Sequence, residues 1–308
     1  MEIKADEDKT YTGGFVAAPS DPWGTSVSAD GAGDHGYHVV WTRDEYEMAS
    51  ALLAAGDTAD ADAALQYIFS YEEEPSGAVK QNTVLNGTTV FGSLQMDEVA
   101  DPIILAYQLG ATDPADWAHI QALANYLVAN GPFTPQERWE ENSGYSPATM
   151  AAEIAGLICA ASIAEANGAT SLAASYQATA LSWASGLDGR TYTTTGPYGG
   201  GDYYLRITPD GNPHSGASIS IANGGGGHDD RTVVDPSFLE LVRLGATRWM
   251  ATIEAVANTT LSYKYDLGGS WAGVEKDANC ADIANRSMSV DGGTVGDTVA
   301  NWGGSGGC

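Results

Sequence analysis

The 308-residue sequence is short of positive charge, cysteine and metal-ligand patterns, and each shortage excludes a class of protein. Its 13 lysines and arginines stand against 40 aspartates and glutamates, and the net charge of −27 repels nucleic acids and anionic membranes. Three cysteines, Cys159, Cys280 and Cys308, are too few for a disulfide framework, and we expect Cys159 to be a core thiol. The five histidines lack metal-ligand spacing, so we expect neither a metal nor a cofactor.

Long apolar runs are also missing. No stretch approaches the roughly 18 consecutive apolar residues that a membrane helix requires, so we expect no membrane partner. The N-terminal sequence MEIKADEDKTYTGG has neither the apolar segment nor the cleavage pattern of a signal peptide. These observations favour a cytoplasmic location over secretion, which stays open, as does the oligomeric state.

The excess of acidic residues has two explanations of equal weight. Self-repulsion of this size is best tolerated where salt screens it, which indicates a halophilic source with a salt-rich cytosol. The alternative is an acidic protein with an ordinary surface, because the acidic residues are scattered and the apolar content of 43% is normal.

The apolar residues recur at helical spacing, which predicts an all-α protein with a sizeable core. Long loops alternate with short turns between these helices, and this alternation suits a toroid of helix pairs whose active site is built from loops at one end. Pro102 is expected in the first turn of its helix or at a kink. The predicted helices span residues 43–55, 60–71, 97–109, 114–130, 147–167, 172–187, 235–245 and 249–258, whereas residues 1–40 and the glycine-rich stretch 189–234 are predicted to be irregular.

The segment QERWEENSGYSP over residues 136–147 is the most informative for chemistry. It places three carboxylates, Glu137, Glu140 and Glu141, within five residues, next to Trp139 and Tyr145. Neighbouring anions and an indole both favour a protonated carboxyl group, which can donate a proton to a glycosidic oxygen. An acidic cluster that stabilises a helix N-terminus explains the same residues about equally well.

Three further segments place polar and aromatic side chains where loops run into helices. In the segment HVVWTRD, Trp41 can stack on a sugar while Arg43 and Asp44 bind its hydroxyl groups, although a capped helix start with a local ion pair is the better explanation of this segment taken alone. The segment FGSLQMDE contributes Gln95 and Asp97. The segments DYYLRI and ANGGGG follow, and ANGGGG lacks the Lys-Ser/Thr of a phosphate-binding loop, which excludes nucleotide binding.

Taken together, these segments resemble the glucoamylase-like glycosidases of glycoside hydrolase family 15, in their bacterial and archaeal form. The resemblance covers roughly residues 5–263, and WTRD combined with QERWEE and GYSP is specific. It implies an (α/α)6 toroid, the six-hairpin glycosidase fold, and a hydrolase that releases glucose from the non-reducing end of α-glucans or oligosaccharides with inversion. The family also holds dextran- and trehalose-hydrolysing enzymes, so the linkage stays open.

The resemblance also implies roles for individual residues. Glu140 would be the general acid, and Glu137 and Glu141 would tune it and bind sugar at the neighbouring subsite. Arg43 and Asp44 would hold hydroxyl groups of the terminal glucose. The remaining implied residues would line or support the pocket: Trp41, Gln95, Asp97, Trp139 and Tyr145.

One family motif is not found in the sequence. The family's general base lies in an LPEQ-like motif, which the 308 residues do not contain, and Glu275, the one glutamate of the tail, receives no such role. We therefore expect residues 1–263 to form a partial catalytic domain, incomplete at its C-terminal end, and the glycine-rich residues 264–308 to be poorly structured. The alternatives to an active enzyme are a glucan-binding fragment without the base and an acidic interaction scaffold.

Overall fold

The computed structural model describes residues 2–18, 37–221 and 225–246, together with four short strands further along the chain. The chain divides into two units, residues 1–248 and residues 249–308. The helical elements of the first unit are α1 (Glu2–Asp6), α2 (Thr42–Ala54), α3 (Thr58–Tyr67), the π-helical turn η1 (Ile68–Glu72), α4 (Met96–Leu109), α5 (Pro114–Asn130), α6 (Pro147–Ala166), α7 (Thr170–Thr191), the 3-10 turns η2 (Asp230–Thr232) and η3 (Pro236–Leu239), and α8 (Glu240–Arg243).

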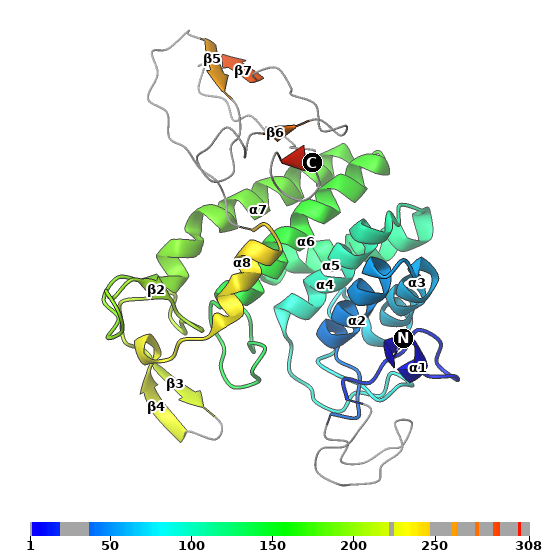
Figure 1. The fold of residues 1–308 in the computed structure, drawn as a ribbon, viewed down its shortest axis with the longest axis horizontal. Coiled ribbons are helices and arrows are strands. Elements are labelled where there is room, and N and C mark those ends of the chain that lie inside the picture. The colour runs from blue at the N-terminus through cyan, green and yellow to red at the C-terminus, as the bar shows by residue number, and fades with distance from the viewer. Residues whose placement is uncertain are drawn as a thin grey trace. The chain divides into compact units, whose positions relative to one another are not determined.

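The long helices pack as three successive pairs, α2 with α3, α4 with α5 and α6 with α7, drawn in blue, cyan and green in Figure 1. Helix α4 lies between α2 and α6, and α6 also contacts α8. Local signals set the helix ends: Asp113 caps α5 by accepting from the amides of Ala115 and Asp116, and Gly110 ends α4 in a left-handed conformation. The start of α4 is joined to the start of α2 by the Arg43–Asp97 ion pair and to the loop before α6 by the Gln95–Gln136 hydrogen bond, so α2, α4 and α6 begin at the same end of the unit.

The core is centred on α6, which is buried over most of its circumference. A side chain at Gly156 would bring its Cβ to 3.0 Å from the Cβ of Ala100, so the glycine allows α4 and α6 to approach closely. Helix α6 is long and apolar enough to cross a membrane by composition, but 83% of its most apolar window is buried inside the protein. We therefore interpret it as a core helix.

The glycine-rich stretch holds two short antiparallel ribbons. Strand β1 (Tyr192–Thr193) pairs with β2 (Tyr203–Tyr204), and β3 (Ser218–Ile221) pairs with β4 (Gly225–Asp229). In the second unit, β5 (Thr260–Tyr263) pairs with β7 (Arg286–Ser289), and β6 (Glu275–Lys276) pairs with β8 (Asn301–Trp302). The predicted boundary at residue 263 and the predicted lack of structure in 264–308 fall largely outside the described residues and stay predictions.

Seven of the predicted helices are present, with ends that differ by a few residues. In the range predicted as one helix, 60–71, the α-helix ends at Tyr67 and a π-helical turn follows it. The sequence did not predict this change, because the hydrophobic pattern of five residues does not distinguish an α-helix from a π-helix. The helix predicted over 235–245 is present over 236–243, where the 3-10 turn η3 leads directly into the short helix α8. Pro102 lies inside α4, beyond its first turn, and the helix predicted over 249–258 lies outside the described residues.

The N-terminal segment contains a short helix, α1, that the sequence did not predict. Lys4 of this helix pairs with Asp57 at 2.9 Å and with Asp60 at 2.6 Å, both at the start of α3. A helix of five residues is too short to be stable by propensity alone, so this tertiary contact accounts for it. Cys159 is partly buried on α6, where burial raises the pKa of its thiol to about 12.

Candidate active site

The loops that precede α2, α4 and α6 meet at the end of the unit where these helices begin. Trp41 immediately precedes α2, and its indole Nε1 donates to Glu140 Oε1 at 3.0 Å across 99 residues of sequence. Trp41 is 4% exposed, whereas Glu140 is exposed to solvent. The two most informative segments of the sequence therefore lie against each other.

A chain of hydrogen bonds continues from Glu140 into the interior. The side-chain amide of Gln136 donates to the Glu140 carbonyl oxygen at 3.2 Å and accepts from Gln95 Nε2 at 2.9 Å. Gln95 is buried and accepts from the guanidinium group of Arg43. Arg43 Nε in turn donates to Asp97 Oδ2 at 2.9 Å. Residues from the starts of α2 and α4 and from the loop before α6 thus form one connected polar network.

Arg43 is surrounded by carboxylates at the start of α4. Besides Asp97, its Nη2 lies 3.7 Å from Glu98 Oε1, and Asp101 is buried one turn further along the helix. Burial raises the pKa of Glu98 and of Asp101 well above the usual range, and Arg43 opposes that rise in both. Neither oxygen of Glu98 has a hydrogen-bond partner among the described residues, and nor does Oδ1 of Asp97.

Glu137 organises the loop that carries the other acidic residues. It is 1% exposed, and its Oε2 accepts from the Trp139 amide at 2.9 Å. Its Oε1 accepts from the amides of Glu141 and Asn142 at 3.3 and 3.2 Å. The buried carboxylate therefore holds together the turn that contains Glu140.

Within this turn Glu140 has a φ of 64°, the left-handed region that side chains other than glycine rarely adopt. Its neighbour Trp139 is 54% exposed, and the Trp139 indole N–H donates to the buried Asp235, which also caps η3. A strained backbone at an exposed carboxyl group is typical of functional sites.

Arg206 is a component of the site that the sequence argument missed. It lies two residues after β2 and is 7% exposed. Its Nη2 donates to Glu137 Oε1 at 2.7 Å and also to the carboxylate of Glu141. The segment DYYLRI is noted in the sequence for its aromatic and polar residues, but nothing in it indicates a partner 69 residues away.

Two of the predicted site residues lie apart from this network. The ring of Tyr145 packs edge-on against Phe133 with centroids 5.6 Å apart and lies under the Arg190 guanidinium group at 4.4 Å. Asp44 is partly buried on α2, and burial raises the pKa of its carboxyl group while Arg43 and Arg138 oppose the rise.

Two exposed aromatic rings lie beside Trp41: Phe91, from the segment FGSLQMDE noted in the sequence, and Tyr37, which the sequence did not indicate. Tyr37 and Phe91 have ring centroids 5.8 and 6.4 Å from that of Trp41 and are 50% and 43% exposed. Flat apolar rings beside hydrogen-bonding groups are what a sugar-binding surface requires. The described residues contain no group of three or more His, Cys, Asp or Glu side chains that could hold a metal ion.

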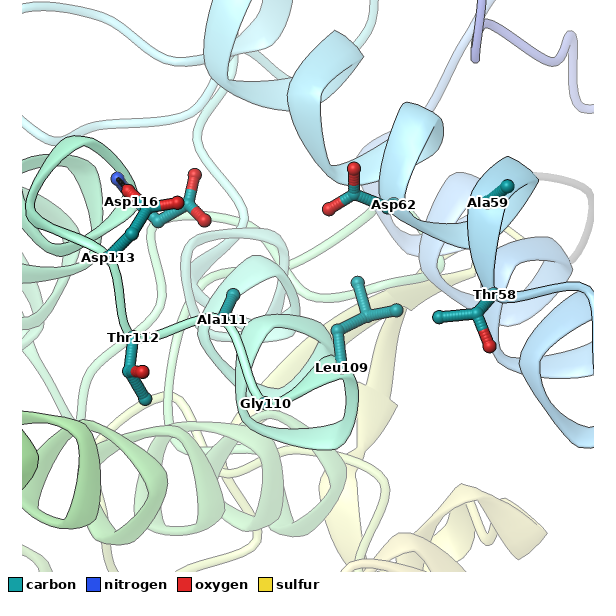
Figure 2. Close-up of a pocket in the computed structure, with 9 residues that line it drawn as sticks. All are labelled: Thr58, Ala59, Asp62, Leu109, Gly110, Ala111, Thr112, Asp113 and Asp116. Atoms are coloured by element: carbon teal, nitrogen blue, oxygen red, sulfur yellow. Dashed lines mark hydrogen bonds between the residues drawn. The ribbon is translucent and has the colours of Figure 1, made fainter.

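A separate pocket of about 580 Å³ lies at the opposite ends of the helices. Figure 2 shows it between Asp62 of α3, Leu109 at the end of α4, and Asp113 and Asp116 at the start of α5. Asp113 caps its helix and Asp116 accepts from Gln66 at 2.9 Å, so both carboxylates have structural partners. None of the predicted site residues lines this pocket.

Comparison with protein families decides the affiliation of the chain. The model of the glycosyl hydrolases family 15 matches residues 1–251. The chain belongs to this family. The membership expected from WTRD, QERWEE and GYSP is thereby confirmed.

Individual relatives agree with this affiliation. The chain is 45% identical to a glucoamylase of Clostridium sp. (strain G0005) over 276 residues, which is 88% of this chain and 39% of that protein. It matches the crystal structure of a bacterial glucoamylase complexed with acarbose with a TM-score of 0.73 and 48% identity, over 79% of this chain and 36% of that chain. The chain therefore spans less than half the length of these relatives.

These comparisons confirm the predicted all-α fold of the (α/α)6 toroid, of which the described residues hold three helix pairs. A wild-type glycosidase matches with a TM-score of 0.50 and 18% identity, over 62% of this chain and 54% of that chain. That likeness extends the shared fold to a distant relative.

Proposed function

We propose that this chain carries the general acid and the glucose-binding groups of an exo-acting, inverting α-glucan hydrolase. The observation that carries the proposal is the 3.0 Å hydrogen bond from Trp41 to Glu140, which joins an aromatic sugar-binding surface to a carboxyl group. The relatives named glucoamylase, one of them bound to acarbose, support the same reaction and an oligosaccharide substrate.

In this proposal Glu140 protonates the glycosidic oxygen as the bond between C1 and that oxygen breaks. A water molecule attacks C1 from the opposite face and gives up a proton to a base, so the anomeric configuration is inverted. The half-exposed Trp139 and the nearby Trp41 would form the walls of the glucose pocket. The proposal assigns the acid and the glucose-binding groups only.

The hydrogen bonds that hold Arg43 in place support the sugar-binding roles. Arg43 and Asp44 would bind hydroxyl groups of the terminal glucose, while Gln95 and Asp97 hold the Arg43 guanidinium group in place. Such groups are effective when their own positions are fixed by a second layer of hydrogen bonds.

Among the residues around the acid, Glu141 and Glu137 would tune Glu140, and the burial of Glu137 favours an indirect role over sugar contact. Tyr145 would contribute to the wall of the site.

A glucan-binding protein without hydrolytic activity is the second candidate. The 308 residues contain no LPEQ-like motif, so no base is assigned in this chain. Since a general acid or base contributes about 10²–10⁴-fold in rate, loss of the base would leave binding intact and nearly abolish turnover. Hydrolysis of dextran-type linkages or of trehalose by the same site is a variant of the first candidate.

Both candidates are tested by assaying free glucose from maltose, isomaltose, starch and trehalose, with acarbose binding measured by calorimetry on the same protein. The hydrolase predicts glucose release that falls at least 10²-fold in Glu140→Gln with binding retained. Binding with no release above that variant supports the second candidate. If the protein shows no acarbose binding and no glucose release, both candidates are contradicted and the acidic scaffold is supported.

We further propose that the net charge of −27 reflects adaptation to high salt. Raising KCl from about 0.1 to 1 M shortens the screening length from about 10 to about 3 Å, so the melting temperature should rise. Sucrose serves as the control, because it stabilises folded proteins without screening charge. A melting temperature that responds equally to both solutes contradicts the proposal.

A further inference from the structure

A buried ion-pair cluster underlies the loop that carries the candidate acid. Glu137 and Glu141 flank Trp139 and Glu140 in sequence, and Arg206 donates to both flanking carboxylates. The side chain of Arg206 is 8% exposed and that of Glu137 is 1% exposed, so this pair lies beneath the turn and not at its surface.

The backbone of Arg206 is itself fixed. Its amide donates to the Val233 carbonyl oxygen at 3.3 Å, and the preceding residue, Leu205, donates to Thr191 at the end of α7 at 2.9 Å. Two residues later, Thr208 and Tyr145 exchange backbone hydrogen bonds at 3.0 Å in both directions. The guanidinium group therefore projects from a segment that is bonded to the body of the domain and to the far end of the loop.

Glu137 connects Arg206 to the backbone of the turn by hydrogen bonds. Its carboxylate accepts from the amides of Trp139, Glu141 and Asn142, and its own carbonyl oxygen accepts from the Glu140 amide at 2.8 Å. These bonds enclose Glu140 and accompany its left-handed φ of 64°. Each bond to the Glu137 carboxylate depends on the orientation of that carboxylate, which the bound guanidinium group of Arg206 fixes.

We propose that Arg206 is a positioning residue that fixes the turn of residues 137–141, and thereby the Glu140 carboxyl group, by bridging Glu137 and Glu141. Arg206 makes no sugar contact in this role, because its bonded Nη2 is directed at these two carboxylates beneath the turn. The catalytic part of the inference rests on the proposed role of Glu140, whereas the structural part stands without it.

The first test measures amide hydrogen exchange in the full chain. Arg206→Met should accelerate exchange of the Trp139, Glu141 and Asn142 amides at least tenfold and leave the amides in the middle of α6 unchanged. Arg231→Met is the matched control, because Arg231 also pairs with a carboxylate, Asp229 at 2.6 Å, and lies outside the turn. Unchanged exchange in folded Arg206→Met overturns the proposal.

Two further variants keep the test informative if Arg206→Met does not fold. Arg206→Lys retains the charge but presents one ammonium group in place of a planar fork, so it should accelerate exchange less than Met. Glu141→Gln removes one of the two bridged carboxylates and should give a partial acceleration. Wild-type exchange rates in both folded variants would contradict the bridging role.

The second test separates positioning of an acid from general damage. On maltose, Arg206→Met should lower kcat about 10²-fold with little change in KM, as expected for a displaced catalytic group. On 2,4-dinitrophenyl α-glucoside, whose leaving group needs no protonation, kcat should fall less than threefold. An equal loss on both substrates overturns the proposal that Arg206 acts through the acid.

The failure of each proposal has its own signature. If Glu140→Gln does not alter glucose release, the proposed function fails, while amide exchange still decides whether Arg206 fixes the turn. If Glu140→Gln is inactive on maltose and Arg206→Met is fully active, the Arg206 proposal alone fails.

Discussion

Two arginines with little exposed surface, Arg43 and Arg206, each lie among carboxylates near the candidate acid, but their surroundings differ. Arg43 faces Asp97 and Glu98, and oxygens of both lack a hydrogen-bond partner among the described residues. Arg206 faces Glu137, whose oxygens also accept three backbone amides. Carboxylate oxygens without partners are suited to binding a ligand, whereas a carboxylate whose two oxygens accept several donors, as in Glu137, is suited to holding a loop.

The position of the two clusters in the fold supports this contrast. Arg43 and Asp97 lie in the first turns of α2 and α4, so rigid helices set their separation. Arg206 and Glu137 lie in loops, and their geometry depends on the contacts between them. On the two proposals above, the same pair of residue types would serve recognition at Arg43 and loop architecture at Arg206.

The largest expected effect comes from removing the arginine of the less satisfied cluster. Arg43→Met removes the ion-pair partner of the buried Asp97 and should lower the free energy of unfolding by about 3–5 kcal/mol. Arg206→Met should cost about 2 kcal/mol, because the Glu137 carboxylate keeps its backbone donors. Urea denaturation of both variants checks the order, and a larger loss in Arg206→Met would break the comparison.

The next effect is on pH dependence and concerns Glu98. Burial raises the pKa of its carboxyl group well above 4.5, so the folded state favours the neutral form. The stability from this group is fully present below about pH 4.5 and is lost as the pH rises towards the folded pKa. Glu72, whose pKa burial raises to about 8, adds to the same loss between about pH 4.5 and 8.

Glu98→Gln should therefore flatten the fall in melting temperature between pH 5 and 8, because glutamine stays neutral. The exposed Glu165 provides the matched control, since Glu165→Gln removes a carboxyl group from the surface of α6. If the melting temperature of Glu98→Gln falls with pH as steeply as that of the wild type, the Glu98 carboxyl group is ionised beside Arg43. The two clusters would then both be ion pairs, and the contrast between them would be weaker.

The smallest effect concerns the backbone strain that the Arg206 cluster holds in place. Glu140 has a φ of 64°, a left-handed conformation in which a Cβ atom is disfavoured. Glu140→Gly should therefore be more stable than Glu140→Ala by about 0.5–1 kcal/mol. Both variants lose the bond to Trp41, so their difference isolates the strain. At the exposed helical position Gln177 the order should reverse.

Local sequence patterns predicted the long helices well, because the helical spacing of apolar residues can be recognised within the helix's own sequence. Helix α5 matches the predicted 114–130 at both ends, where Asp113 and Pro114 start it and Gly131 follows it. Short elements were predicted poorly. Helix α1 depends on Lys4 reaching α3, and such a tertiary contact leaves no local pattern.

The candidate site divides in the same way. Adjacent residues such as Arg43 and Asp44, or Glu140 and Glu141, stand out in the sequence because their chemistry is concentrated there. Tyr37 did not stand out, since it is one aromatic residue in an irregular segment until the fold brings it beside Trp41.

By itself, the sequence determined the helical class of this protein, its acidic charge and the two segments that contain Trp41 and Glu140, because each is a property of neighbouring residues. Only the tertiary structure decided that these two side chains meet across 99 residues, and that Arg206 bridges Glu137 and Glu141. Hydrogen bonds between distant segments depend on how helices pack and loops close, and no local pattern encodes their partners.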